Sequence, residues 1–221
     1  MSNLKEPIMT LYKIGGLGAD ERVFEKLTLN TPSVSIKWLA AVKNESLQDY
    51  VIRLSNQIDQ SKEFGLIGVS FGGVIAIELS KIVNPKTVIL VSSVSKSDEL
   101  PYQSMRLILS NLIKLIPYQL IKTPQYIMYY MFGAIDKDLL SRIISDTDPK
   151  FIKWAMDKIL NWDYNGEVED ILRIHGSKDR LIPIIGKAHM VQNGGHFMIV
   201  NKASQISLLI NEFIDGKLVD E

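Results

Sequence analysis

The chain of 221 residues contains no cysteine, and this absence removes several kinds of chemistry. Without cysteine there is no disulfide, no thiolate nucleophile and no cysteine metal ligand. No stretch of about 18 apolar residues runs without a charge or a breaker, so no segment is expected to span a membrane. The N-terminal segment MSNLKEPIMT lacks the basic and long apolar regions of a signal peptide, which makes a cytoplasmic location the expectation.

The sequence also lacks an excess of charge of either sign. Its 25 Lys and Arg residues balance 25 Asp and Glu residues, so the field of the whole molecule attracts neither nucleic acid nor an anionic membrane. With 46% hydrophobic and 23% charged residues, the composition is that of a globular protein with a sizeable core. We therefore expect no nucleic-acid partner and no stable membrane insertion.

Strands and helices are predicted to alternate along most of the chain. Alternation of this kind forms an α/β fold, in which a mostly parallel sheet carries helices on both faces. Short apolar runs bounded by turn residues indicate strands at 8–14, 33–38, 64–69, 87–91, 171–174 and 188–192, and helical spacing of apolar residues indicates helices at 46–60, 71–82, 150–162 and 203–213.

Residues 98–148 interrupt this alternation with a stretch that is helical throughout, apart from Pro and Gly breaks. At its end, Asp148 and Pro149 have the form of an N-cap followed by Pro at the first helical position. We therefore predict one core domain formed by residues 1–97 and 149–221, with a helical cap formed by residues 98–148.

The segment Gly-Val-Ser-Phe-Gly-Gly (68–73) matches the pattern G-x-S-x-G. An apolar strand leads directly into it and an apolar helix leads directly out, which is the context of a nucleophile elbow. The serine of such an elbow has a strained backbone, so the residues two positions to either side must be nearly free of side chain. The alternative is a glycine-rich turn with a structural serine, and the context favours Ser70 as a nucleophile.

A serine hydroxyl needs a base to take its proton, and the chain has three histidines. His189 lies inside a predicted strand, where packing or a local hydrogen bond is the simpler role. His175 ends a strand before Gly176, a position that commonly orders a loop. His196 lies in a glycine-rich loop between the last predicted strand and the last helix. We expect His196 to be the base, with His175 as the second choice.

The third member of such a site holds the imidazole in one tautomer and stabilises its charged form. Asp179 follows a predicted strand in the segment His-Gly-Ser-Lys-Asp-Arg-Leu-Ile-Pro (175–183). A surface turn aspartate paired with a neighbouring basic residue is the alternative, since Asp is common in turns. Asp98 is the competing acid and Asp148 a more distant one, and Asp179 is preferred.

Backbone donors for an oxyanion hole are expected from the loop Gly-Gly-Leu-Gly (15–18), which follows the first predicted strand. If this loop lies beside the elbow, the donors are the N–H groups of Leu17 and of Phe71, the residue after the nucleophile. Gly16 is then expected to border the substrate. A glycine turn that only closes the strand is the alternative.

These segments, with Gly-Gly-His-Phe (194–197), resemble the α/β-hydrolase fold family over nearly the whole chain, and the order Ser…Asp…His is the one that this fold uses. The resemblance implies an acid on the Asp179 loop and a base on the His196 loop. The N-terminus has no room for the two extra strands of larger members, so a trimmed sheet of about six strands is expected. Gly15 stands where many members have histidine.

In this family a helical insertion at residues 98–148 would lie over the serine. The segment 126–132 is rich in aromatic residues and Met, which line adaptable apolar pockets, so Met128 and Tyr129 are expected to contact the substrate. The alternatives are that these residues form the core of the cap itself, or that the amphipathic stretch 105–116 meets a membrane surface.

The resemblance implies a serine hydrolase that cleaves a carboxylic ester or thioester of a small to medium substrate through a covalent acyl-Ser70 intermediate. No metal or organic cofactor is implied. A ligand-binding protein that keeps the fold is the alternative, as are serine-elbow enzymes of other reaction types: C–C hydrolases, lyases and perhydrolases. Ser rather than Asp at the elbow argues against dehalogenase and epoxide-hydrolase chemistry.

Overall fold

The computed structural model describes residues 9–101, 103–117 and 125–216, and within these ranges it contains one sheet of six strands. The strands lie in the order β2-β1-β3-β4-β5-β6, and each neighbouring pair is parallel. The predicted α/β class with a trimmed parallel sheet is confirmed. The strands are β1 (Thr10–Ile14), β2 (Ser33–Ser35), β3 (Phe64–Val69), β4 (Thr87–Val91), β5 (Ile171–Gly176) and β6 (His189–Val191).

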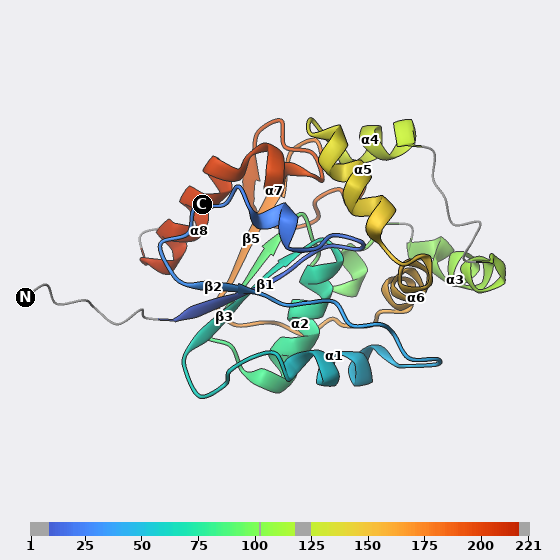
Figure 1. The fold of residues 1–221 in the computed structure, drawn as a ribbon, viewed down its shortest axis with the longest axis horizontal. Helices are drawn as coiled ribbons and strands as arrows, with labels where there is room; N and C mark the ends of the chain where they lie inside the picture. Colours follow the sequence, from blue (N-terminus) through green and yellow to red (C-terminus); the bar gives the residue numbers. More distant parts are fainter. Residues whose placement is uncertain (1–8, 102, 118–124, 217–221) are drawn as a thin grey trace, which may run out of the picture.

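Helices cover both faces of this sheet (Figure 1). Successive side chains of a strand point to opposite faces, so neighbouring residues of β3 enter two different hydrophobic clusters. Leu66 packs in the cluster shared with α1 and α2, and Ile67 packs in the cluster shared with α7 and α8. The bounds of these helices are α1 (Leu47–Ser55), α2 (Phe71–Val83), α7 (Met198–Asn201) and α8 (Ala203–Ile214).

The other four helices gather at one end of the molecule, at the right of Figure 1: α3 (Arg106–Leu115), α4 (Gln125–Phe132), α5 (Lys137–Asp146) and α6 (Pro149–Leu160). Helix α6 begins as predicted, because Asp148 accepts a hydrogen bond from the Lys150 N–H at 2.9 Å and Pro149 is the first helical residue. None of the helices in the described ranges is long and apolar enough to cross a bilayer.

Two predicted elements are shorter in the structure than the sequence indicated. A pair of hydrogen bonds connects the segments that follow them. The helix predicted over 46–60 ends at Ser55, and the strand predicted over 33–38 ends at Ser35. The side-chain amide of Gln57 donates to the Lys37 carbonyl and accepts from the Lys37 N–H, both at 2.9 Å. Backbone groups of Lys37 therefore pair with a side chain instead of a strand.

Two predicted elements extend beyond the described residues. Ile8, where the first strand was predicted to begin, lies outside the described residues, and so do residues 102 and 118–124 of the predicted cap. The division into a core and a cap stays a prediction.

Candidate active site

The sheet brings loops from distant parts of the sequence to one edge. Because all six strands are parallel, their carboxyl ends meet there, where ligands of open α/β sheets bind. The register pairs Ile14 with Gly68, Val69 with Val91, and Val91 with Ile174. The loops that follow β1, β3 and β4 therefore start at nearly the same level, and β5 continues two residues further, to Gly176.

Ser70 joins β3 to α2 with φ 53° and ψ −121°. A positive φ is unfavourable for a residue with a Cβ atom and persists only where surrounding contacts hold it. Two contacts do so here, one from the end of the neighbouring strand β4 and one from the loop after it. The Ser70 N–H donates to the Val91 carbonyl at 3.0 Å, and the Ser93 hydroxyl donates to the Ser70 carbonyl at 2.7 Å.

The glycines around Ser70 are required by close backbone approach. A Cβ atom at Gly68 would lie 2.4 Å from the Cα of Gly73. A Cβ atom at Gly72 would lie 2.3 Å from the Ile14 carbonyl oxygen, in the strand beside it. Real Cβ atoms do not approach other atoms so closely, so the G-x-S-x-G pattern follows from the packing of this turn.

The structure brings together Ser70, His196 and Asp179. His196 Nε2 lies 2.9 Å from Ser70 Oγ, and His196 Nδ1 lies 2.8 Å from Asp179 Oδ2. An ionised carboxylate only accepts hydrogen bonds, so Nδ1 carries the proton and Nε2 is left to accept from the serine hydroxyl. His196 and Asp179 are buried, while Ser70 is partly exposed. This arrangement is suited to removing the proton from Ser70.

The loop that holds Asp179 fixes its carboxylate. Oδ1 accepts from the N–H groups of Leu181 at 3.0 Å and Ile182 at 2.9 Å, and His175 Nε2 lies 3.4 Å from Oδ2. Burial by itself would raise the pKa of Asp179, but the hydrogen bonds from His175 and His196 and the backbone outweigh it and hold this pKa well below its usual range. The carboxylate is therefore ionised.

His175, the second choice for the base, contacts Asp179 and has no recorded contact with Ser70 in the described residues. The other candidates do not join these side chains. Asp98 is exposed, and Asp148 caps α6. His189 begins β6, half-buried, and has no recorded contact with Ser70 in the described residues. The part of the chain that the structure describes also holds no group of three or more His, Asp or Glu side chains arranged to bind a metal ion.

The loop after β1 lies against the elbow. A Cβ atom at Gly16 would be 3.2 Å from Ser70 Cβ and 3.8 Å from Ser70 Oγ. The loop is closed by a hydrogen bond from the Ala19 N–H to the Gly16 carbonyl at 2.9 Å. The Thr147 hydroxyl lies 2.7 Å from the Gly18 carbonyl and holds the loop from outside. Gly16 therefore lies beside Ser70, and its contact with a substrate stays a prediction.

The two expected oxyanion donors are the backbone N–H groups of Leu17 and Phe71. Within the described residues, neither the Leu17 N–H nor the Phe71 N–H donates a recorded hydrogen bond. Phe71 is the first residue of α2, where N–H groups have no partner inside the helix. Their use as an oxyanion hole stays a prediction.

Phe132, at the end of α4, contacts the predicted base and is a residue that the sequence did not single out. Its ring meets the His196 imidazole edge-on, with centroids 5.2 Å apart and an interplanar angle of 85°. Its carbonyl accepts from the Phe197 N–H at 2.8 Å. Within a run so rich in aromatic residues and Met, only its place directly before Gly133 distinguishes it.

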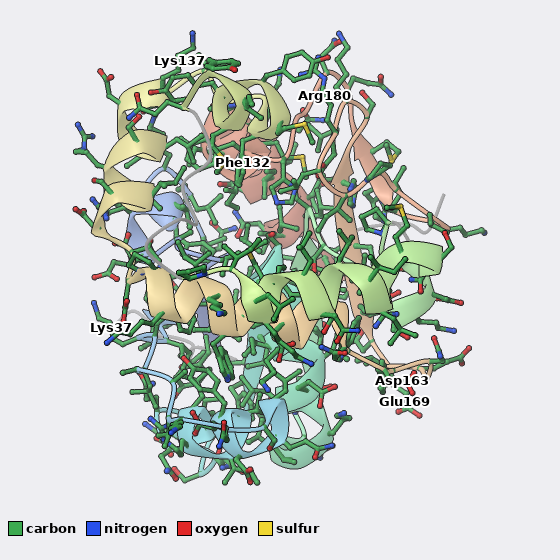
Figure 2. All side chains as sticks on the ribbon, turned by 90° about the vertical axis from the view of Figure 1, so that its right-hand side faces the viewer. Lys37, Phe132, Lys137, Asp163, Glu169 and Arg180 are labelled. Carbon is green, nitrogen blue, oxygen red and sulfur yellow. The ribbon has the colours of Figure 1, made fainter. Side chains whose placement is uncertain are left out.

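The same end of α4 also contacts the loop of the predicted acid. The guanidinium of Arg180 lies over the Tyr130 ring, 4.2 Å from its centroid, and donates to the Tyr130 carbonyl at 2.9 Å. Figure 2 views this end of the molecule, and Phe132 and Arg180 both lie in its upper half. This end of α4 therefore touches the loops of both Asp179 and His196.

Met128 and Tyr129, the two expected substrate contacts on α4, are half-buried. The Tyr129 hydroxyl is hydrogen-bonded to Ser141 Oγ at 2.6 Å, and Lys137 lies over the Tyr129 ring. These contacts join α4 to α5. In the described residues neither side chain has a recorded contact with Ser70, so their role in substrate binding stays a prediction.

No protein-family model matches this sequence, and no curated protein matches it either. Solved structures do match. MenH from S. aureus has a TM-score of 0.72 and 17% identity, over 98% of this chain and 97% of that one. A hydrolase from Oleispira antarctica has a TM-score of 0.71 and 16% identity, over 94% and 91%.

A lipase-esterase related protein from Clostridium acetobutylicum has a TM-score of 0.67 and 19% identity, over 95% of this chain and 96% of that one. The likeness extends over nearly the whole of each chain. At these identities it establishes the fold, and the chain has the α/β-hydrolase fold that its sequence motifs resemble.

Proposed function

We propose that this protein is a serine hydrolase that cleaves a carboxylic ester or thioester of a small to medium substrate. The observation that carries the proposal is the continuous hydrogen-bonded chain from Ser70 Oγ through His196 to the ionised Asp179. It lies at the carboxyl edge of the sheet, in the fold that MenH, a hydrolase and a lipase-esterase related protein share.

In the first half of the reaction, Ser70 Oγ attacks the carbonyl carbon while its proton moves to His196 Nε2. The bond from carbon to the leaving oxygen or sulfur then breaks, and His196 returns the proton to that atom. In the second half, water gives a proton to His196 as it attacks the acyl-Ser70 ester. The acid leaves, and the proton returns to Ser70 Oγ.

Negative charge develops on the carbonyl oxygen in both halves. The N–H groups of Leu17 and Phe71 are our proposed donors to this oxygen, because each lacks another recorded acceptor in the described residues and Gly16 borders Ser70. Asp179 stabilises the imidazolium that forms and keeps its Nε2 directed at Ser70.

Residues 98–148 serve in this proposal as a lid. Two contacts support that role: Phe132 lies against the His196 ring, and Thr147 is bonded to the Gly18 carbonyl. The segment therefore meets the base on one side and the oxyanion loop on the other. A closed pocket under such a lid admits short acyl groups better than long ones. Met128 and Tyr129 are proposed to line it.

The test is labelling by a fluorophosphonate, which reacts with an activated serine, followed by mapping of the modified peptide. We expect the label on Ser70, none on the Ser70→Ala variant, and unchanged labelling of Ser61→Ala, which alters an exposed serine. p-Nitrophenyl esters from acetate to laurate should be hydrolysed with a preference for short chains. Labelling of another residue, or of none, contradicts the proposal; labelling of Ser70 without ester turnover favours the other serine-elbow reactions.

A further inference from the structure

His175 is a second buried imidazole directly behind the proposed acid. It lies near the end of β5 with only 2% of its surface exposed. Its Nε2 atom lies 2.7 Å from the Ile182 carbonyl oxygen and 3.4 Å from Asp179 Oδ2. Both oxygens are acceptors, so Nε2 carries a hydrogen and donates chiefly to the nearer one.

Ile182 connects His175 to the other oxygen of the carboxylate. The Ile182 N–H donates to Asp179 Oδ1 at 2.9 Å, while the Ile182 carbonyl accepts from His175. The same residue is thus held on both sides of its backbone. Since β5 belongs to the interior of the sheet, His175 ties the loop that carries Asp179 to a rigid element.

We propose that His175 is a positioning residue for the proposed hydrolysis: through its Nε2–H it fixes the loop at 179–182 and shares Asp179 Oδ2 with His196. This inference rests on the proposed function of Ser70. His175 does not reach Ser70 itself, so it acts through the acid. The Nε2–H group of His175 partly neutralises the Asp179 carboxylate, and this reduces the negative charge that acts on His196.

The charged groups around this pair are few. Within the described residues, the titratable side chains in contact with the Asp179 carboxylate are His175 and His196. Lys178 is exposed, and Arg180 is turned toward Tyr130. On its other sides the imidazole of His196 meets the Ser70 hydroxyl and the Phe132 ring, neither of which carries charge.

Two variants separate the hydrogen bond from the packing at this position. Gln has its amide nitrogen at nearly the same reach as Nε2, so His175→Gln keeps the donor, while His175→Leu fills the space without one. With p-nitrophenyl acetate, we expect kcat of His175→Leu to fall on the order of 10- to 100-fold, with KM within about twofold, because a misplaced acid impairs the chemical step. His175→Gln should stay within about threefold of the wild type.

The pH profile supplies a readout that a merely structural role would not move. Without the His175 donor, the carboxylate holds more negative charge and stabilises the protonated imidazole of His196 more strongly. The acid limb of kcat/KM should therefore shift to higher pH in His175→Leu and stay in place in His175→Gln. The control is His189→Leu, a histidine on the neighbouring strand with no recorded contact with the triad in the described residues, which should change neither kcat nor the limb.

A measurement on the unmodified protein covers the case in which His175→Leu does not fold. Nitrogen-15 NMR of histidine-labelled wild-type protein distinguishes the two tautomers, and only three histidines need assignment. We expect a proton on Nε2 of His175 and on Nδ1 of His196. A His175 with its only ring proton on Nδ1, or a folded His175→Leu with wild-type kcat and pH profile, overturns the inference. A wild-type protein that the fluorophosphonate does not label contradicts the proposed function instead, and this is seen before any variant is made.

Discussion

Replacement of Asp179 by Asn tests the proposed site most sharply, because every recorded partner of this carboxylate is an N–H donor. Oδ1 receives the backbone N–H groups of Leu181 and Ile182, and Oδ2 receives His196 with His175 behind it. An amide has the same shape but offers one acceptor oxygen and one NH₂ group. Whichever way it turns, the NH₂ group must face donors.

The two orientations of the amide differ in which hydrogen bonds are lost. With the NH₂ group toward Leu181 and Ile182, two buried N–H groups lose their acceptor, at about 1–3 kcal/mol each. With the NH₂ group toward His196, both backbone bonds survive and the imidazole changes tautomer, so that Nδ1 accepts and Nε2 carries the proton. The second orientation is the less costly. It leaves the fold intact and the base unable to accept from Ser70.

We therefore expect Asp179→Asn to lower kcat/KM for p-nitrophenyl acetate by roughly 10⁴-fold, which corresponds to about 5 kcal/mol of transition-state stabilisation. The KM should change little, and circular dichroism should show a folded protein. The matched control is Asp98→Asn, which alters the exposed competitor and should keep full activity. If Asp179→Asn kept activity within about tenfold of the wild type, or if the two variants exchanged effects, the assignment of the acid would be refuted.

Three further outcomes are expected. Ser70→Ala and Ser70→Gly should both abolish ester hydrolysis. Because a positive φ costs a residue with a Cβ about 1–2 kcal/mol, Ser70→Gly should unfold at a temperature roughly 2–8 °C higher than Ser70→Ala. Equal melting temperatures would contradict the backbone strain at Ser70. Because the folded-state pKa of Asp179 lies below that of an unfolded Asp, near 3.9, its contribution to stability is present above that pH and is lost as the pH falls toward the folded value. The free energy of unfolding in urea should accordingly fall more steeply below about pH 4 in the wild type than in Asp179→Asn, and parallel curves would count against it. Phe132→Ala should lower kcat/KM for short acyl esters by about tenfold while longer chains are hydrolysed relatively better, whereas Tyr126→Ala, at an exposed position of the same helix, should have no effect.

The sequence predicted those parts of the molecule that depend on local rules. Strands β3 and β4 were predicted at their observed bounds, because short continuous apolar runs bounded by polar residues are typical of buried parallel strands. The N-cap at Asp148 followed from the same kind of rule. The three side chains expected at the site meet because a parallel sheet places the loops after its strands at one edge.

Contacts between residues far apart in the chain could not be predicted from such local rules. The pairing of Gln57 with Lys37, which shortens one helix and one strand, joins residues 20 positions apart. Phe132 reaches His196 from another part of the chain, and within the run of aromatic residues only its place directly before Gly133 distinguishes it. His175 was expected only to order the loop after its strand. That its Nε2 lies against the Ile182 carbonyl and also faces Asp179 depends on how this loop folds back.

The elbow shows why the proposed nucleophile is easier to recognise from sequence than its proposed partners. Its backbone conformation brings neighbouring atoms so close together that Gly68 and Gly72 have no substitute with a Cβ atom, and this requirement appears as a fixed spacing within five residues of the sequence. A base or an acid needs only the correct side chain at the end of some loop. The conformation of Ser70 is held by Val91 at the end of β4 and by Ser93 in the loop that follows β4, so the geometry of the proposed nucleophile depends on these neighbours and not on the turn alone. Mutations that loosen β4 from β3 should therefore reduce activity before they unfold the protein.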